Sequence, residues 1–359
     1  MILLDSLSAE WLKSVSSKLG KVDVSLLEKA VRALFLAEQL KVNDLTFVFK
    51  GGTSLLLHLE KPLRFSIDVD IITSDDKATL TKAINAVVET GAFTRWEADE
   101  RTLRKDLPVD HYKFFYKSQF PSPTAENYIL LDVLYQNPLP VWVEQKAMQH
   151  PWLKAEGEPV QLTLSTIGGL LGDKLTAFAP TTTGILYTKD RPVEIIKQLF
   201  DIGCLYNLVG DLAETQTAFQ TVAAEELKYR EQTITTSEVL SDSFSAALTI
   251  CDRDLKDPNF QHLAKGIHNI KPHIFYRFVI EDAMVGAAKV MLLSTLLRQD
   301  FKEAPHKFGA AKDVIDWLIP TTDYNRFNKL KKTNPEAFFY IYKTCEHLTH
   351  QQHDPEERR

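Results

Sequence analysis

The chain has 359 residues, of which 44% are hydrophobic and 25% charged, and its formal net charge is −6 at pH 7. This length exceeds that of one typical domain, so two domains are expected. The acidic balance excludes a protein that is basic throughout, although a local basic groove for nucleic acid is compatible with it. No run of about 18 apolar residues occurs without a charge, so we expect no membrane-spanning helix.

The three cysteines, Cys204, Cys251 and Cys345, lie far apart and form no CxxC motif. Their odd number and wide spacing indicate neither a zinc site nor a disulfide framework. The N-terminal segment has no basic region followed by a long apolar core, so we expect no signal peptide. Together these features predict a protein of the reducing cytoplasm.

Two helices are expected before the first strand, over residues 5–18 and 25–40. Ser25 and Glu28 have the spacing of a capping box, which predicts the start of the second helix. Apolar residues recur along this helix at helical spacing, which favours a packing role.

The most informative stretch, residues 47–73, predicts a strand, a glycine turn, a short helix, a loop and a second strand. Gly51 and Gly52 interrupt an apolar run of β-forming residues, and Thr53 and Ser54 then open the short helix. A proline after this helix prevents its continuation, so the chain is expected to re-enter as a strand.

A strand that begins at Arg64 would place alternate side chains on opposite faces. One face would be polar and carry Arg64, Ser66, Asp68 and Asp70, whereas the other would be core and carry Phe65, Ile67, Val69 and Ile71. The two carboxylates would lie roughly 7 Å apart, because each strand residue rises about 3.3 Å. Mg²⁺ prefers such oxygen ligands, and a glycine turn and an arginine both bind phosphate. The stretch therefore predicts a metal-assisted phosphoryl or nucleotidyl transfer site.

The next elements expected are a helix over residues 77–89 and strands over residues 111–116 and 128–135. Residues 93–106 carry arginines among acids, which favours a solvated hairpin over an RNA-facing edge. Asp132 is the single carboxylate of an otherwise apolar strand, and burying it is costly unless a partner compensates its charge. A backbone N–H or an arginine would be an ordinary partner. The scattered histidines, His111 among them, show no metal-ligand spacing and receive no role.

A short strand over residues 160–164 is followed by a helix that contains the segment GDKLTAFAP. Residues 181–190 form a polar connection and the expected domain boundary. The helix over residues 193–208 places Lys197 and Asp201 one turn apart, a spacing that an ordinary salt bridge would explain.

From about residue 210 to residue 350 the pattern predicts helices almost throughout, over residues 211–232, 237–255, 276–299, 308–318 and 334–347. The densest basic cluster is RFNKLKK at residues 326–332, with aromatic residues interleaved. It is equally compatible with a clamp for a nucleic-acid backbone and with a solvated turn.

The pattern KGGTSL…RFSIDVD resembles the nucleotidyltransferase signature of the polymerase-beta-like superfamily, and in particular that of the AbiEii/AbiGii toxin family. The resemblance implies an α+β fold, with a mixed β-sheet flanked by helices and a mostly α-helical C-terminal domain. It implies a nucleotidyltransferase domain over residues 1–185 and a helical domain over residues 186–350 that binds the acceptor and completes the active site. Residues 351–359 are expected to be a frayed tail.

The same resemblance implies roles for individual residues. The nucleotide is expected to bind at Gly51, Gly52, Thr53, Ser54, Arg64, Ser66 and Lys174. The metal, Mg²⁺ or Mn²⁺, is expected on Asp68, Asp70 and Asp132, the last as a third acid on a neighbouring strand. The residues carried over as catalytic are Asp68, Asp70, Lys174 and Asp201.

Lys174 lies in the GDKL segment, which resembles a family motif whose helix lysine reaches the nucleotide phosphates. Asp201 matches the last acid of a further motif, in which Gln198 stands where another acid is common.

The function that the resemblance implies is Mg²⁺-dependent transfer of NMP from an NTP to an acceptor hydroxyl. The expected acceptor is the 3′ end of tRNA, where added nucleotides would block translation, and the expected partner is a cognate antitoxin encoded nearby. Two alternatives remain. One is a nucleotidyl- or phosphotransferase that acts on a protein or a small molecule, and the other is a non-catalytic NTP- or RNA-binding member of the family.

Overall fold

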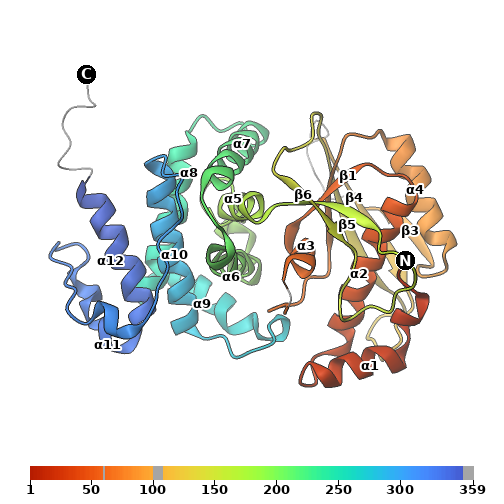
Figure 1. Ribbon diagram of the computed structural model, residues 1–359, viewed down its shortest axis with the longest axis horizontal. Helices are drawn as coiled ribbons and strands as arrows, with labels where there is room; N and C mark the ends of the chain where they lie inside the picture. The colour runs from red at the N-terminus through yellow and green to blue at the C-terminus, as the bar shows by residue number, and fades with distance from the viewer. Residues whose placement is uncertain (60, 100–107, 351–359) are drawn as a thin grey trace. The chain divides into compact units, whose positions relative to one another are not determined.

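A computed structural model describes residues 1–59, 61–99 and 108–350 of the chain (Figure 1). The chain divides into two compact units. The first comprises Met1–Thr166 and Pro272–Tyr276, and the second comprises Ile167–Lys271 and the chain from Arg277 onward. The boundary predicted after residue 185 therefore lies inside the second unit. The tail predicted at residues 351–359 lies outside the described residues.

The first unit contains a mixed β-sheet. Its strands are β1 (Phe47–Lys50), β2 (Val69–Thr73), β3 (Arg95–Ala98), β4 (Val109–Tyr116), β5 (Asn127–Tyr135), β6 (Val143–Ala147) and β7 (Gln161–Ser165). Among the described residues, these seven strands form one sheet in the order β3-β4-β5-β2-β1-β7-β6. β2 runs parallel to β5 and β1 runs parallel to β7, whereas the other neighbouring strands are antiparallel. Within residues 93–106, predicted as a hairpin, the structure forms β3, which pairs with β4, and residues 100–106 lie outside the described part of the chain.

The helices of the first unit are α1 (Ala9–Lys18), α2 (Val24–Val42), α3 (Gly51–His58) and α4 (Lys77–Glu89), after a short 3₁₀ turn at Leu4–Leu7. α4 has the predicted bounds. The capping box predicted at the start of α2 is wrong, because the side chain of Asp23 accepts the backbone N–H of Ser25. Glu28 is buried instead, where it pairs with Arg32 at 3.0 Å and accepts a hydrogen bond from Ser118.

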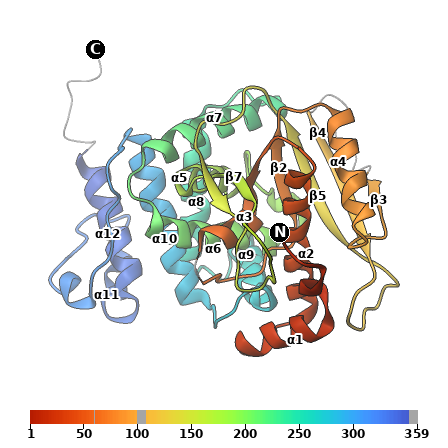
Figure 2. The same ribbon diagram turned by 45° about the vertical axis from the view of Figure 1, so that its right-hand side comes forward.

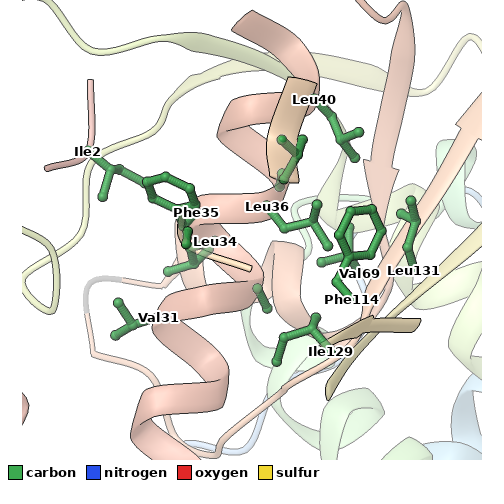
Figure 3. Packing of buried hydrophobic residues seen from close by; sticks show 14 of the residues in the cluster. Ile2, Val31, Leu34, Phe35, Leu36, Leu40, Val69, Phe114, Ile129 and Leu131 are labelled. Carbon is green, nitrogen blue, oxygen red and sulfur yellow. The ribbon is translucent and has the colours of Figure 1, made fainter. Parts of the chain in front are cut away.

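One face of the sheet packs against α2. Figure 2 shows α2 running alongside the sheet where β2 and β5 lie, and Figure 3 shows the packing from close by. The side chains gathered there include Leu36, Leu40, Val69, Phe114, Ile129 and Leu131, all of them buried. Because side chains alternate along a strand, the residues between these apolar ones belong to the opposite face of the sheet.

The second unit is almost entirely helical. Its helices are α5 (Ile167–Ala177), α6 (Pro192–Leu208), α7 (Ala213–Tyr229), α8 (Thr236–Asp252), α9 (Pro258–Asn269), α10 (Ile280–Arg298), α11 (Leu330–Thr333) and α12 (Pro335–His350). Short 3₁₀ turns occur at Tyr187–Lys189, Lys271–His273, Ala311–Val314 and Asn325–Lys329. α10 is buried over most of its length and packs against α6, α8 and α12. None of the described helices combines the length and the hydropathy that crossing a membrane would require.

Two predictions in this unit are corrected. α9 was not predicted, although Asp257 caps it and Pro258 occupies its first turn, both of which are ordinary start signals. Residues 308–318 contain only a single 3₁₀ turn rather than a helix. Ile315 and Leu318 in that segment are exposed, so its apolar residues are not the buried stripe of a packed helix.

The domain division follows from how closely α5 approaches α7. A Cβ atom on Gly172 would stand 2.7 Å from the backbone nitrogen of Phe219 and 2.8 Å from the carbonyl oxygen of Thr215. Gly168, one turn earlier, faces the side chain of Glu214 in the same way. Glycines at these two positions let the two backbones touch, so α5 packs as part of the helical unit rather than with the sheet.

Candidate active site

The glycine turn between β1 and α3 leaves no room for any other residue type at its first position. Gly51 has φ +77, and a Cβ atom there would stand 2.0 Å from Oδ2 of Asp70. The carboxylate of Asp70 therefore packs directly against the turn. Glycine is required on both counts, because it tolerates positive φ and leaves space for the acid.

The second glycine brings two further predicted residues to the same turn. A Cβ atom on Gly52 would stand 2.6 Å from Nη2 of Arg64 and 2.6 Å from Oγ of Ser66. Arg64 is buried, and its Nη1 donates to the carbonyl oxygen of Phe65 at 2.8 Å. An arginine, a hydroxyl and a carboxylate therefore meet the backbone at the start of α3.

The hydroxyl groups of Thr53 and Ser54 hold this turn in shape. Thr53 donates to the backbone carbonyl of Asp68, and Ser54 donates to that of Gly51 at 2.9 Å. His58, the last residue of α3, contacts the carbonyl oxygen of Ser165 through Nε2 at 3.0 Å, which ties the helix to β7. Burial lowers the pKa of His58, although the neighbouring Glu144 carboxylate acts in the opposite direction.

The strand predicted from Arg64 onward is shorter than expected, because β2 begins only at Val69. Arg64 instead forms an isolated antiparallel bridge with Ile274, and the N–H of Phe65 donates to the carbonyl of His273 at 2.7 Å. This local pairing takes the chain out of the sheet. Three residues of the expected core face are buried, with exposed fractions of 1% for Phe65, 0% for Val69 and 1% for Ile71. Ile67, the fourth, is only partly buried.

On the sheet face opposite α2, four polar residues form one row across four adjacent strands. Lys50 of β1 pairs with Asp70 of β2, Asp70 pairs with Asp132 of β5, and Asp132 pairs with His111 of β4. Residues paired directly across strands share a face, and neighbouring strands lie about 4.8 Å apart. The structure therefore brings Asp70 and Asp132 together, and Asp68 lies one residue before β2.

One partner of Asp132 is a histidine. Nδ1 of His111 lies 2.6 Å from Oδ1 of Asp132. Sequence reasoning gave His111 no role and did not consider a histidine as a partner of this acid. A sequence signal existed, since His111 alternates with the aromatic residues of its strand and Asp132 is the single acid of an apolar strand, but the pairing depends on the register between β4 and β5.

In the second unit, two other predicted residues meet. Nζ of Lys174 on α5 lies 3.1 Å from Oδ2 of Asp201 on α6, and the two side chains are 8% and 2% exposed. The salt bridge that the sequence suggested between Lys197 and Asp201 is wrong, because Lys197 pairs with Glu194 at 2.9 Å. Gln198 donates to the carbonyl of Glu194 at 3.4 Å.

The basic cluster at residues 326–332 is partly engaged within its own unit. Arg326 makes a bidentate ion pair with Asp252, at 2.6 and 2.9 Å. Nζ of Lys331 donates to the carbonyl oxygen of Trp317 at 2.6 Å. Two of the four cations of the cluster thus support the helical fold, which reduces the charge available for a nucleic-acid clamp.

The sheet row fits a divalent cation of the magnesium type. Within the described part of the chain, no three His, Cys, Asp or Glu side chains gather as a metal-ligand cluster. Mg²⁺ does not require one, because it is commonly bound by one or two carboxylates together with water and substrate phosphates. Asp70 and Asp132 offer two carboxylates of adjacent strands on one face.

Comparison with known proteins gives one family. The model of the family described as nucleotidyl transferase AbiEii toxin, type IV toxin–antitoxin system, matches residues 34–274. A search of curated proteins found no match. Among solved structures, JHP933 from Helicobacter pylori is 18% identical with a TM-score of 0.38, and the match covers 78% of this chain and 96% of that one. An antigenic nucleotidyltransferase-like protein from Paracoccidioides brasiliensis is 15% identical with a TM-score of 0.33, covering 65% and 98%.

Proposed function

Because the chain belongs to the AbiEii nucleotidyl transferase toxin family of type IV toxin–antitoxin systems, we propose that it transfers NMP from an NTP to the 3′ end of tRNA. The chain is a nucleotidyltransferase, and its family implies an NTP substrate and an antitoxin partner. Nucleotides added to tRNA would block aminoacylation and so translation. We further propose that it acts in the cytoplasm, where NTPs and tRNA are present.

The observation that carries this proposal is the row of Asp70 and Asp132 beside the glycine turn. We assign the divalent cation, Mg²⁺ or Mn²⁺, to these two acids. Asp68, which lies outside β2 and does not form a cluster of three ligands with them, remains a predicted ligand only. When bound, the cation would neutralise phosphate charge and favour in-line displacement. Backbone N–H groups of the turn and the guanidinium of Arg64 would hold the triphosphate.

In the reaction, the acceptor oxygen forms a bond to the α-phosphorus as the bond to pyrophosphate breaks, and the acceptor hydroxyl loses its proton. The chain supplies positioning and charge rather than covalent chemistry, as is general for transfers of this type. Ser66 and Lys174 remain predicted nucleotide ligands, and Asp201 remains a predicted catalytic residue.

A protein or a small molecule is the second candidate acceptor. The net charge of −6 and the internal ion pair of Arg326 favour it over a long polyanion.

The test is to incubate the protein and Mg²⁺ with total tRNA and with each labelled NTP in turn. We expect labelled tRNA with at least one NTP, and a loss of about 100-fold or more in Asp70→Asn, because the metal site loses a charge. Asp110→Asn is the matched control, since Asp110 precedes His111 on β4 and so belongs to the opposite face of the sheet. It should transfer like the wild type.

Label on protein instead of tRNA would replace the proposed acceptor with the second candidate. Near-normal transfer by Asp70→Asn would remove the assignment of the site. Absence of transfer to any acceptor, with NTP binding intact by calorimetry, would favour a non-catalytic family member.

A further inference from the structure

The hydrogen bond between His111 and Asp132 joins two strands at the acidic row. The two side chains are 16% and 31% exposed, so the bond is partly shielded from water. A carboxylate only accepts hydrogen bonds, so Nδ1 of His111 carries the proton that it donates to Oδ1. The bond fixes the rotamer of Asp132 from a different strand.

The hydrogen bond from His111 uses only one acceptor position of the Asp132 carboxylate. A carboxylate has about four acceptor positions on its two oxygens. Asp132 can therefore accept from His111 and still offer oxygen to a cation that Asp70, its register partner on β2, also faces. Hydrogen-bond partners that orient metal ligands commonly change metal affinity about 10–100-fold when they are removed.

We propose that His111 is a positioning residue, whose Nδ1–H holds the carboxylate of Asp132 in the orientation that binds the divalent cation. The inference rests on the proposed function, because it takes Asp132 as a metal ligand. It adds a residue to the site that neither the glycine turn nor the acidic motif contains.

The inference can be tested because another side chain can supply the same hydrogen-bond donor. The side-chain amide nitrogen of asparagine occupies nearly the place of Nδ1 in histidine, so His111→Asn keeps the donor. His111→Leu fills similar space without a donor. Lys113→Met is the matched control, because Lys113 lies two residues along the same strand and donates to a different carboxylate, Asp99, at 2.9 Å.

The experiment titrates Mn²⁺ alone into each variant and follows the free ion by electron paramagnetic resonance, at a temperature where circular dichroism shows every variant folded. We expect His111→Leu to weaken Mn²⁺ binding about 10–100-fold. His111→Asn should stay within about threefold of the wild type, and Lys113→Met should match the wild type.

Wild-type affinity in His111→Leu would overturn the inference, and so would an equal loss in His111→Asn and His111→Leu. Wild-type affinity with slower transfer in His111→Leu would also overturn it, because the histidine would then act on the acceptor rather than on Asp132. Asp132→Asn separates this failure from that of the proposed function. If Asp132→Asn loses Mn²⁺ binding and His111→Leu does not, only the inference about His111 fails. If Asp132→Asn binds Mn²⁺ like the wild type, both the inference and the metal site of the proposed function fail.

Discussion

At the level of single residues, the glycine turn controls where the acids of the site can lie. Gly51 combines a positive φ with direct contact to the carboxylate of Asp70, and Gly52 makes room for Arg64 and Ser66. The motif was predicted from sequence as a phosphate-binding turn. Its packing against Asp70 gives the two glycines a second reason to be glycine, which is to seat the carboxylate.

The chain offers a matched pair of substitutions to separate backbone strain from displacement of the acid. Gly20 has φ +86, close to the +77 of Gly51, but nothing lies within 4 Å of a Cβ atom built on it. We expect Gly20→Ala to lose about 1–2 kcal/mol of unfolding free energy from the left-handed conformation, and Gly51→Ala to lose more, because its Cβ atom also displaces Asp70. Only Gly51→Ala should also lose transfer, by about tenfold or more, because Asp70 must move.

Urea unfolding and the tRNA-labelling assay, run side by side on both variants, check this expectation. Equal transfer by the two variants would show that the contact between Gly51 and Asp70 has no part in the chemistry.

At the level of elements, helix spacing predicted α4 and most of the C-terminal helices, because those segments bury one continuous stripe. It failed at residues 308–318, where apolar residues recur but Ile315 and Leu318 are exposed and only Val314 is buried. Helix spacing also did not predict that α5 belongs to the helical unit. The glycines of α5 indicate close packing only once α7 is known to lie against them.

The ion pair between α5 and α6 leads to a prediction about stability. Lys174 and Asp201 are both buried, and removing one partner of such a pair leaves the other charge uncompensated. We expect Lys174→Met to cost about 3–5 kcal/mol. The double variant Lys174→Met/Asp201→Leu should recover most of that loss, whereas transfer should stay absent, because the lysine predicted to reach the phosphates is still missing.

Urea unfolding of the two single variants and the double variant gives the coupling energy between the residues. Lys197→Met is the control, because its pair with the more exposed Glu194 should contribute no more than about 1 kcal/mol. A Lys174→Met variant as stable as Lys197→Met would contradict the structural role of the pair.

At the level of the whole molecule, each of the two units has its own core, and their stabilities need not respond alike to pH. The first unit buries His150, which packs against Trp152 with ring centroids 4.5 Å apart. Burial lowers the pKa of His150 to about 4. Nδ1 of His150 accepts the backbone N–H of Trp152 at 3.3 Å, a bond that the neutral ring makes and the protonated ring cannot.

This pKa predicts acid sensitivity of the first unit. The unfolded state binds the proton at an ordinary pKa of about 6.5, well before the folded state does. The contribution of His150 to the free energy of unfolding is therefore fully present above about pH 6.5. It falls by about 1.4 kcal/mol per pH unit between about pH 6.5 and about pH 4. His58, whose pKa is also lowered by burial, adds to the loss with the same sign.

Unfolding free energies of the wild type and of His150→Asn at pH 7 and pH 5 measure this effect. Asparagine can still accept the Trp152 N–H and does not titrate, so its loss between the two pH values should be smaller by about 2 kcal/mol. An identical loss in both proteins would assign the acid sensitivity to other groups.

The sequence by itself determined the local features of this protein. Gly51 and Gly52, the alternating acids Asp68 and Asp70, and the spacing of the apolar residues are readable because they depend on neighbours a few positions away. They were enough to indicate the chemistry, and the resemblance of the motif to a known family implied a mixed sheet followed by helices.

Only the tertiary structure decided which of the distant polar residues meet. His111 reaches Asp132 because β4 and β5 adopt one register, and Lys174 reaches Asp201 because α5 and α6 pack side by side. A shift of one residue in register would send His111 to the other face of the sheet. Such pairings are fixed by the burial of apolar side chains along whole elements, so they follow from the packed core and not from any motif in the chain.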